Sequence, residues 1–259
     1  MRAKAKISMR VGLVSVPEVV VYSGIDSGAK ISMNQLHAEC KHKVQEKLFC
    51  PDCAKDILDK ENEIVKGYPN GKNEWVVLSK EEIESCKKES NGVMNVFQFV
   101  EAGEVPTILY SKPHYFGAGK NSAELYGLVY HGIVENKVMG LGKIVMRQKD
   151  HFFCILPYEG ILAGFELHFP EEVRSVDEIE KPKANGFDKD TLKMFSQLIG
   201  KMTKAFDKSV IRDEYTDALR GIIAAKAAGK VIDISVPKVN GSVHLSLKDM
   251  LEQSLAQAA

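Results

Sequence analysis

The spacing of the apolar residues changes once along this chain, and that change limits the possible folds more than any other feature. Residues 7–23 first alternate between apolar and polar and then become almost wholly apolar, which is typical of strands. From 188 to 207 the apolar residues recur instead at helical spacing, and the intervening segment 171–186 is charged and contains Pro182. The sequence therefore predicts a mixed α+β chain with a strand-rich part before a helical one.

Further strands are expected in the first two-thirds of the chain, at 75–78, 93–100, 108–110, 138–146, 152–156 and 161–168. Short helices interrupt them, one capped by Ser79 and one over residues 121–134. The helical stripes of 188–207 and 215–223 are typical of ordinary core packing. We expect three parts: a β-rich core at 1–180, a helical arm at 181–230, and a linker with a short helix at 231–259.

The last part combines turn-forming residues with one more helix. Ser246 and Asp249 have the spacing of a capping box, and the helix behind them carries four apolar residues on one face: Leu247, Met250, Leu251 and Leu255. A short amphipathic helix on a linker has little core to join. The sequence therefore predicts that this helix docks on a partner protein.

Composition places the chain among folded proteins, because 44% of its 259 residues are hydrophobic and 27% are charged. The longest mainly apolar stretch, 152–165, is broken by Pro157 and Glu159 and is shorter than the roughly 20 residues of a membrane-spanning helix. The first residues lack the apolar segment of a secretory signal. We expect a cytoplasmic protein without a membrane partner.

The 35 basic and 35 acidic residues give a formal net charge of zero, so no global excess points to nucleic acid. The charges are nevertheless segregated. Residues 1–17 hold four basic residues and no acid, and residues 137–151 hold four basic residues and one acid. Each stretch is either a solvated hairpin face or a surface that contacts phosphates.

The most specific local motif consists of four residues: His37, Cys40, Cys50 and Cys53. They form two pairs, each spaced to chelate one ion, and four protein ligands leave no open position for catalysis. The sequence therefore predicts structural zinc in the loop 37–53. Two alternatives remain: His42 replaces His37 as a ligand, or the loop holds reduced, unpaired thiols.

No recognisable catalytic frame is present, since the sequence lacks GxxxxGK, GxSxG, HExxH and a dinucleotide-binding fingerprint. Cys86 with His114 or His131 would form a nucleophile and base only if the fold brought them together. A lyase that uses Lys4 or Lys6 would need that amine to be desolvated. The sequence favours a non-enzymatic protein.

Motifs spread over nearly the whole chain point to one family. They are the stretch Val11–Pro17, QLHAEC with CPDC, IVKGY with VVLS, Lys112 with Pro113 and Tyr115, the run from Ile144 through Arg147 and Lys149 to His151, FPEEVR, and DEYTDAL with AAKAAGK. Together they resemble the prokaryotic Ku proteins, the DNA end-binding factors of bacterial nonhomologous end joining. The chain departs from the family pattern at Ala5 and Arg10.

The resemblance implies a Ku-type β-barrel core, a C-terminal helical arm, and a ring-forming homodimer that threads onto broken double-stranded DNA ends without sequence preference. It implies a nucleoid-associated protein whose last helix recruits an ATP-dependent end-joining DNA ligase. The match to the family's basic positions assigns phosphate contacts to Arg147 and Lys149, and three further residues are weaker candidates: Lys6, Arg10 and Lys143. The absence of a recognition helix or an exposed aromatic stripe agrees with phosphate contacts rather than base reading. The alternative function is a zinc-ribbon adaptor that binds RNA or internal DNA.

Overall fold

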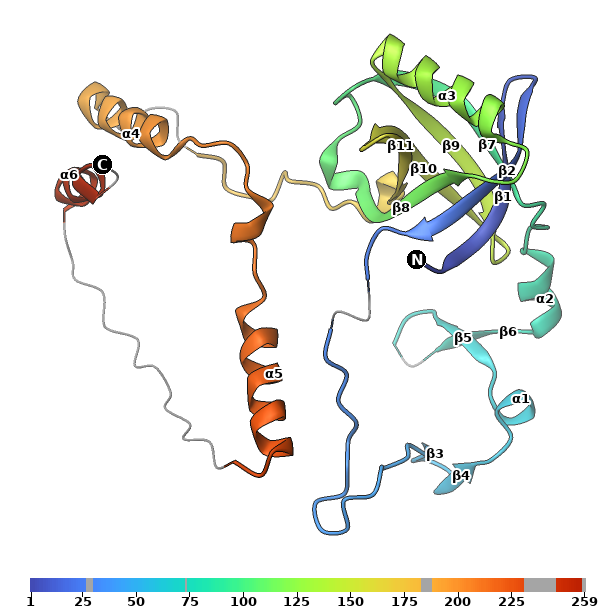
Figure 1. Ribbon diagram of the computed structural model, residues 1–259. Coiled ribbons are helices and arrows are strands. Elements are labelled where there is room, and N and C mark those ends of the chain that lie inside the picture. Colours follow the sequence, from blue (N-terminus) through green and yellow to red (C-terminus); the bar gives the residue numbers. More distant parts are fainter. Residues whose placement is uncertain (27–29, 73, 183–187, 231–245, 258–259) are drawn as a thin grey trace. The chain divides into compact units, whose positions relative to one another are not determined.

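The computed structural model describes residues 1–26, 30–72, 74–182, 188–230 and 246–257. Residue contacts divide the chain into two units, Met1–Arg174 and Ser175–Ala259. The first unit contains the strands, and the second is helical (Figure 1). Most of the predicted linker, 231–245, lies outside the described residues.

Seven strands of the first unit close into a barrel in the order β1-β2-β8-β11-β10-β9-β7 (Figure 1). Neighbouring strands run antiparallel except β1 and β7, which are parallel and close the barrel. The strands are β1 (Ala3–Val11), β2 (Val14–Ser23), β7 (Val93–Glu101), β8 (Tyr110–Ala118), β9 (Val138–Met146), β10 (Lys149–Tyr158) and β11 (Ile161–Leu167). The expectation of a mixed α+β fold with a β-barrel core and a helical arm is confirmed.

Local chemistry explains where three of the strands begin or end. The predicted segment 7–23 is a hairpin, in which Gly12 takes a φ of 57° at the first position of a two-residue turn. The predicted strand at 108–110 is wrong, because Thr107–Leu109 forms a 3-10 turn, η2. Pro106, with a φ of −57°, precedes this turn and accepts the N–H of Leu109, so that β8 begins only at Tyr110.

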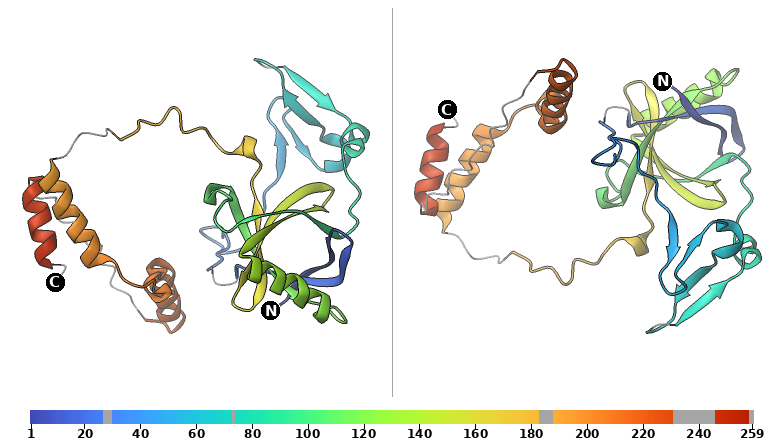
Figure 2. Two further views of the ribbon diagram at one scale, coloured as in Figure 1. Left: turned by 90° about the horizontal axis from the view of Figure 1, so that it is seen from above. Right: turned by 90° about the horizontal axis from the view of Figure 1, so that it is seen from below.

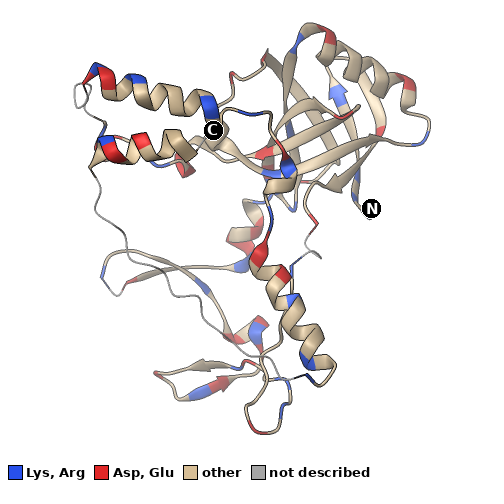
Figure 3. Cartoon of the chain, turned by 60° about the vertical axis from the view of Figure 1, so that its left-hand side comes forward, with Lys and Arg blue, Asp and Glu red and all other residues tan. Residues whose placement is uncertain are grey.

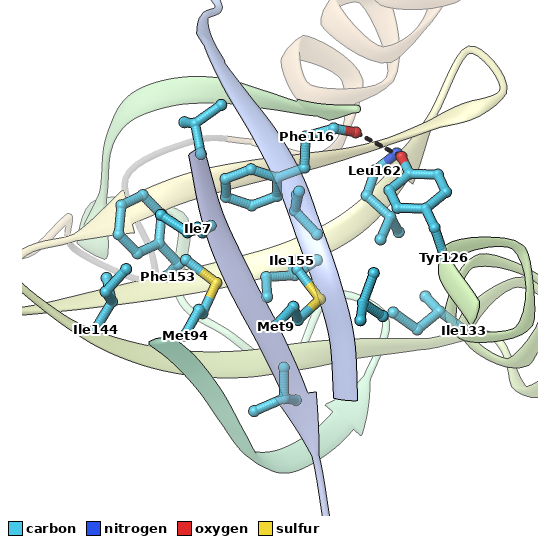
Figure 4. Packing of buried hydrophobic residues seen from close by; sticks show 14 residues of the cluster. Ile7, Met9, Met94, Phe116, Tyr126, Ile133, Ile144, Phe153, Ile155 and Leu162 are labelled. Carbon is cyan, nitrogen blue, oxygen red and sulfur yellow. Dashed lines mark hydrogen bonds between the residues drawn. The ribbon is translucent and has the colours of Figure 1, made fainter. Parts of the chain in front are cut away.

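The barrel interior is packed with side chains from all seven strands and from α3 (Ala123–Asn136) (Figure 4). Phe116 and Phe153 are almost fully buried, and a Cβ at position 164 would lie 2.2 Å from the ring of Phe116, so glycine makes room for that ring. The hydroxyl of Tyr126 donates to the Phe116 carbonyl and accepts the Leu162 N–H at 2.8 Å. These hydrogen bonds fix α3 to the barrel.

Small elements occupy the chain between β2 and β7: β3 (Leu48–Cys50), β4 (Lys55–Ile57), α1 (Lys60–Glu63), β5 (Lys66–Pro69), β6 (Trp75–Leu78) and α2 (Lys80–Ser85). The predicted N-cap Ser79 forms a complete capping box with Glu82. Every residue of the strands β5 and β6 is exposed, including Tyr68 and Trp75. A two-stranded hairpin of this kind is marginally stable without a partner surface.

The second unit contains α4 (Lys189–Met202), α5 (Glu214–Ala227) and α6 (Leu247–Gln257), as the helical spacing predicts. These helices carry charges of both signs (Figure 3). The expectation that the α4 stripe is ordinary core is wrong, since Leu192 and Ile199 are 58% and 52% exposed. Among the described residues, α4 packs against α6, and Leu251 of α6 is the one side chain of this pair that is buried. In the described part of the chain, no helix combines the length and apolar character needed to span a membrane.

Candidate nucleic-acid interface

Two of the predicted phosphate contacts lie in one row across the outer surface of the barrel. Arg10 on β1 is paired with Asn95 on β7, and Asn95 is paired with Lys143 on β9. Their sequence neighbours Met9 and Met94 are buried, so these residues point outward by strand alternation. Two strand spacings separate Arg10 from Lys143, or about 10 Å. The barrel therefore brings together basic residues that are distant in sequence.

Arg147 lies at the tip of the β9–β10 hairpin, between the strands that the sequence predicts at 138–146 and 152–156. Met146 is paired with Lys149, so the turn consists of Arg147 and Gln148, with φ values of 49° and 66°. Left-handed conformations at both positions define a type I′ turn, which normally takes Asn-Gly. A left-handed residue with a side chain costs about 1–2 kcal/mol. Arg147, Gln148 and Lys149 are exposed, so the turn presents a strained, solvated cation.

Lys6 forms an ion pair with a carboxylate on the neighbouring strand β2. Its Nζ lies 3.3 Å from Oε1 of Glu18. The backbone N–H of Lys120 and then Lys6 itself hold the pKa of Glu18 below its ordinary value, because both stabilise the charged carboxylate. Part of the Lys6 charge is therefore neutralised within the protein.

Lys143 likewise forms an ion pair, with Asp150 of the β9–β10 hairpin that carries Arg147. Its Nζ lies 3.3 Å from Oδ2 of Asp150 and 5.3 Å from the centre of the Phe152 ring. Lys88 binds the same carboxylate oxygen at 2.5 Å, and Lys88 first and Lys143 second lower the pKa of Asp150. Asp150 thus stays ionised and fixes the two lysines beside the β9–β10 hairpin.

The other three predicted contacts, Arg10, Arg147 and Lys149, form no ion pair with any acidic residue in the described part of the chain. All three are exposed. Their full charge is available to a phosphate, whereas binding by Lys6 or Lys143 competes with an existing pair. The structure therefore places Arg10 with the stronger candidates.

Three aromatic side chains form a row next to Lys143. Phe97 meets Phe152 edge to face at 6.2 Å, and Phe152 meets Phe169 at 5.9 Å. Phe97 is 56% exposed and Phe169 is 42% exposed. The expectation of no exposed aromatic stripe is thus wrong. No sequence spacing could reveal this row, because its members come from β7, β10 and the segment after β11.

The four predicted zinc ligands form two pairs with the same local turn. Nδ1 of His37 lies 3.2 Å from Sγ of Cys40, and the residue after that cysteine, Lys41, has a φ of 60°. Cys50 ends β3, Cys53 lies in the turn to β4, and Ala54 after it has a φ of 50°. In each pair a left-handed residue directly follows the second ligand and turns the chain back.

The pairs remain separate in this structure. Among the described residues, no three histidine, cysteine or acidic side chains lie close enough together to hold a metal. The backbone N–H of Cys53 lowers the pKa of Cys50, and the neighbouring Cys50 raises the pKa of Cys53, as expected for two sulfurs that share a turn. Each pair has the donors and the spacing of a chelating half-site for zinc.

The catalytic alternatives find little support in the geometry. Lys4 and Lys6 are exposed, so neither amine has the desolvated surroundings that the lyase alternative requires. Cys86 ends α2 in an exposed position, and no hydrogen bond joins it to His114 or His131 within the described residues. No nucleophile and base are therefore brought together at these positions.

The four apolar residues predicted on the last helix do not share one environment. Leu251 is 6% exposed, whereas Leu247 and Met250 are 51% and 44% exposed, and Leu255 is partly buried. The helix α6 packs against α4, where Nζ of Lys201 donates to the Leu255 carbonyl at 3.0 Å (Figure 2). The helix that was expected to have little core to join therefore has α4 as a partner within its own chain. Leu192 and Ile199 of α4 remain exposed beside it.

Comparison with known proteins identifies the barrel. The family model described as the Ku70/Ku80 beta-barrel domain matches residues 10–194, which include the whole barrel except the start of β1. The chain belongs to the Ku family. Membership in the Ku family agrees with the motif resemblance and with the observed closed barrel.

Curated relatives extend the similarity beyond the barrel. The chain is 34% identical to the non-homologous end joining protein Ku of Archaeoglobus fulgidus, over 98% of each chain. It is 30% identical to the protein of that name from Symbiobacterium thermophilum, over 88% of this chain and 56% of that relative. It is 27% identical to the Lachnoclostridium phytofermentans protein of that name, over 95% and 93%. The sequence similarity therefore extends into the helical unit.

Proposed function

We propose that this Ku-family chain is a non-enzymatic protein that binds the ends of double-stranded DNA and acts in nonhomologous end joining. The observation that carries the proposal is the Ku-family barrel with the exposed cations Arg10, Arg147 and Lys149 on its outer strands and hairpin. Cations on strands and turns reach the phosphates, which are the same in every sequence. Binding should therefore be sequence-independent and strongly dependent on salt.

A homodimeric ring is the form of the protein that we propose for this activity. The argument rests on exposed apolar surface that the chain does not cover. The β5–β6 hairpin exposes Tyr68 and Trp75, and α5 exposes Tyr215 at 72%. Exposed aromatic side chains on such a hairpin are typical of an interface between proteins. A second copy of this chain would cover them and allow two barrels to surround a duplex.

Sedimentation tests the dimer with a matched pair of variants. Trp75→Ser should shift the protein toward the monomer, because the indole is 64% exposed in the single chain. Leu13→Ser, at the fully exposed tip of the β1–β2 hairpin, is the control and should leave the dimer intact. A monomeric wild-type protein at micromolar concentration would exclude the ring.

Recruitment of an ATP-dependent DNA ligase is proposed for α6. Leu247 and Met250 remain exposed while α6 rests on α4, so they can contact a partner first. The buried Leu251 becomes available only if the ligase displaces α4. Deletion of 245–259 should leave affinity for linear DNA unchanged and abolish stimulation of ligation. Full stimulation by the truncated protein would refute this role.

A single structural zinc ion is proposed to join the two ligand pairs of the loop 37–53. Their shared turn geometry supports the proposal, since both pairs present their donors in the same way. Four protein ligands would make zinc a clip that orders the segment between β2 and β7, without a position for substrate. The small β3–β4 hairpin would gain its stability from this clip.

Competition between DNA forms tests the main proposal. Labelled linear duplex is bound to the protein and then challenged with unlabelled linear or covalently closed circular DNA of the same sequence. We expect linear DNA to compete in proportion to its ends and circular DNA to compete poorly. Equal competition by the two forms, or preference for RNA, would favour the adaptor function instead.

A further inference from the structure

Polar side chains face into one end of the barrel, where the alternation of the strands would normally place apolar ones. Lys112 and His114 occupy the inward positions of β8 that lead to Phe116, and His151 occupies the one that leads to Phe153 on β10. These residues, together with Glu166 of β11, line a hollow of about 510 Å³. The size lies within the range of small-molecule sites, which barrels often hold at their mouths.

Apolar core residues form the floor of this hollow. Met94, Ile144 and Phe153 line it and lie together at one end of the core cluster, away from Tyr126 (Figure 4). The ring of His114 meets Phe153 edge to face at 5.5 Å. A flat apolar group that entered the mouth would therefore rest on sulfur, aliphatic and aromatic surface.

The side walls offer hydrogen-bond acceptors. Burial lowers the pKa of His114, so the ring is neutral at pH 7. Its Nδ1 lies 3.1 Å from the Lys112 carbonyl, to which a neutral ring donates its proton, and this leaves Nε2 as an acceptor. Oε1 of Glu166 lies 2.6 Å from Nδ1 of His151, and no hydrogen bond occupies Oε2 in the described residues. The inner wall of the pocket thus presents hydrogen-bond acceptors to the N–H groups of a ligand.

The rim has the opposite character. Lys4, Lys6, Lys112 and Arg147 line the mouth. Lys6 is paired with Glu18, whereas the other three form no ion pair with an acid in the described part of the chain. A ligand that fits this pocket is anionic at its outer end, and flat with N–H donors at its inner end.

We propose that the barrel-mouth pocket, lined by Lys112, His114, His151 and Glu166, binds a nucleoside 5′-phosphate. The rim lysines and Arg147 bind the phosphate, and Nε2 of His114 and Oε2 of Glu166 accept hydrogen bonds from the amino group of a base such as adenine. The base rests on Met94 and Phe153. This site goes beyond DNA threading, since its ligand is one nucleotide, either free or at the end of a single-stranded overhang.

Methionine NMR on the full-length wild-type protein tests the site directly. The chain has nine methionines, of which Met94 and Met146 line the pocket, while Met139 belongs to a separate buried cluster. With methyl-labelled methionine, dAMP should shift Met94 and Met146 with a Kd of about 1 mM or tighter and leave Met139 unchanged. Deoxyadenosine should bind about tenfold more weakly, and inorganic phosphate alone should not shift Met94.

Two results would overturn the proposal without any variant. One is the absence of a methyl shift with dAMP well above 1 mM. The other is an equal response to inorganic phosphate and to dAMP, which would mean that the rim binds anions and the interior recognises no base.

Variants then test whether dAMP binds in the barrel-mouth pocket. Ala5→Leu fills the pocket from β1 and should abolish the dAMP response, and Lys112→Ala should weaken it about fivefold. Lys120→Ala, beyond the other end of β8, is the matched control and should leave it unchanged. If Ala5→Leu does not fold, His114→Phe replaces it, because phenylalanine keeps the ring and removes the acceptor. Normal binding by both pocket variants would refute the assignment.

DNA binding by the Ala5→Leu variant shows whether the pocket takes a free nucleotide or the terminal nucleotide of a DNA end. If the terminal nucleotide of a DNA end enters the pocket, this variant should bind a duplex with a 5′-phosphorylated adenine overhang several-fold more weakly than wild type. Binding to a blunt duplex should not change. If only free nucleotide enters, both duplexes should bind as in wild type while the dAMP response is lost. End binding and nucleotide binding are thus measured separately.

Discussion

The strained tip of the β9–β10 hairpin should separate stability from DNA binding. Arg147 and Gln148 both adopt positive φ, where glycine has no steric cost. We predict that Gln148→Gly stabilises the fold and leaves DNA binding unchanged. Arg147→Gly should stabilise the fold to a similar extent and weaken DNA binding, because the same change removes an exposed cation.

The magnitude follows from two opposing effects at each position. A left-handed residue with a side chain costs about 1–2 kcal/mol, and replacement by glycine removes this strain. The greater entropy of glycine in the unfolded chain offsets about 0.5–1 kcal/mol of that gain. The net gain is about 0.5–1 kcal/mol, which corresponds to a rise in Tm of about 2 °C for a unit of this size. Loss of one phosphate contact should reduce the slope of log affinity against log salt by about 0.9.

Urea unfolding and salt-dependent binding to a linear duplex measure the two effects. Lys149→Ala is the comparison for charge alone, since it removes a neighbouring exposed cation where the backbone is extended. It should lower the salt slope like Arg147→Gly without raising stability. If Arg147→Gly destabilises the protein, or if its salt slope equals that of wild type, the interpretation of the tip as a strained phosphate contact is wrong.

Three further predictions concern other parts of the chain. Elemental analysis should find about one zinc per chain, and Cys50→Ser should lower Tm more than Cys86→Ser; less than about a tenth of an equivalent of zinc would contradict the site. Leu251→Ala should destabilise the α4–α6 contact by about 2 kcal/mol and speed amide exchange in α6, whereas Leu247→Ala should affect only ligase stimulation; equal exchange in both variants would refute the packing. Burial lowers the pKa of His114 from 6.5, so the fold should be most stable above pH 6.5 and should lose stability as the pH falls below it; a urea midpoint of His114→Gln with the same pH dependence as wild type would contradict this.

The elements that local chemistry determines could be predicted from the sequence. The predicted strand 138–146 coincides with β9, and the helix capped by Ser79 is α2. The features that could not be predicted depend on contacts between residues that are distant in sequence. The parallel contact of β1 with β7 joins residues more than 80 positions apart, and no local pattern contains that information.

The candidate site divides in the same way. The basic residues of 137–151 could be placed on a hairpin because polar residues separate two apolar runs. The type I′ turn could not be predicted, since Arg147 and Gln148 are not the residues that favour it. The ion pair of Lys143 with Asp150 depends on the hairpin register. The inward-facing His114 does have a signal, because it lies two residues before Phe116 in a strand.

The central proposal is that a ring of two chains threads onto a DNA end, and order of addition at blocked ends tests it most directly. A duplex with biotin at both ends is incubated with the protein either before or after streptavidin closes the ends, and the complexes are then challenged with high salt. We predict no stable binding when the ends are closed first, and complexes that survive the salt challenge when they are closed afterwards. Equal binding in both orders, or complete loss at high salt in both, would contradict threading.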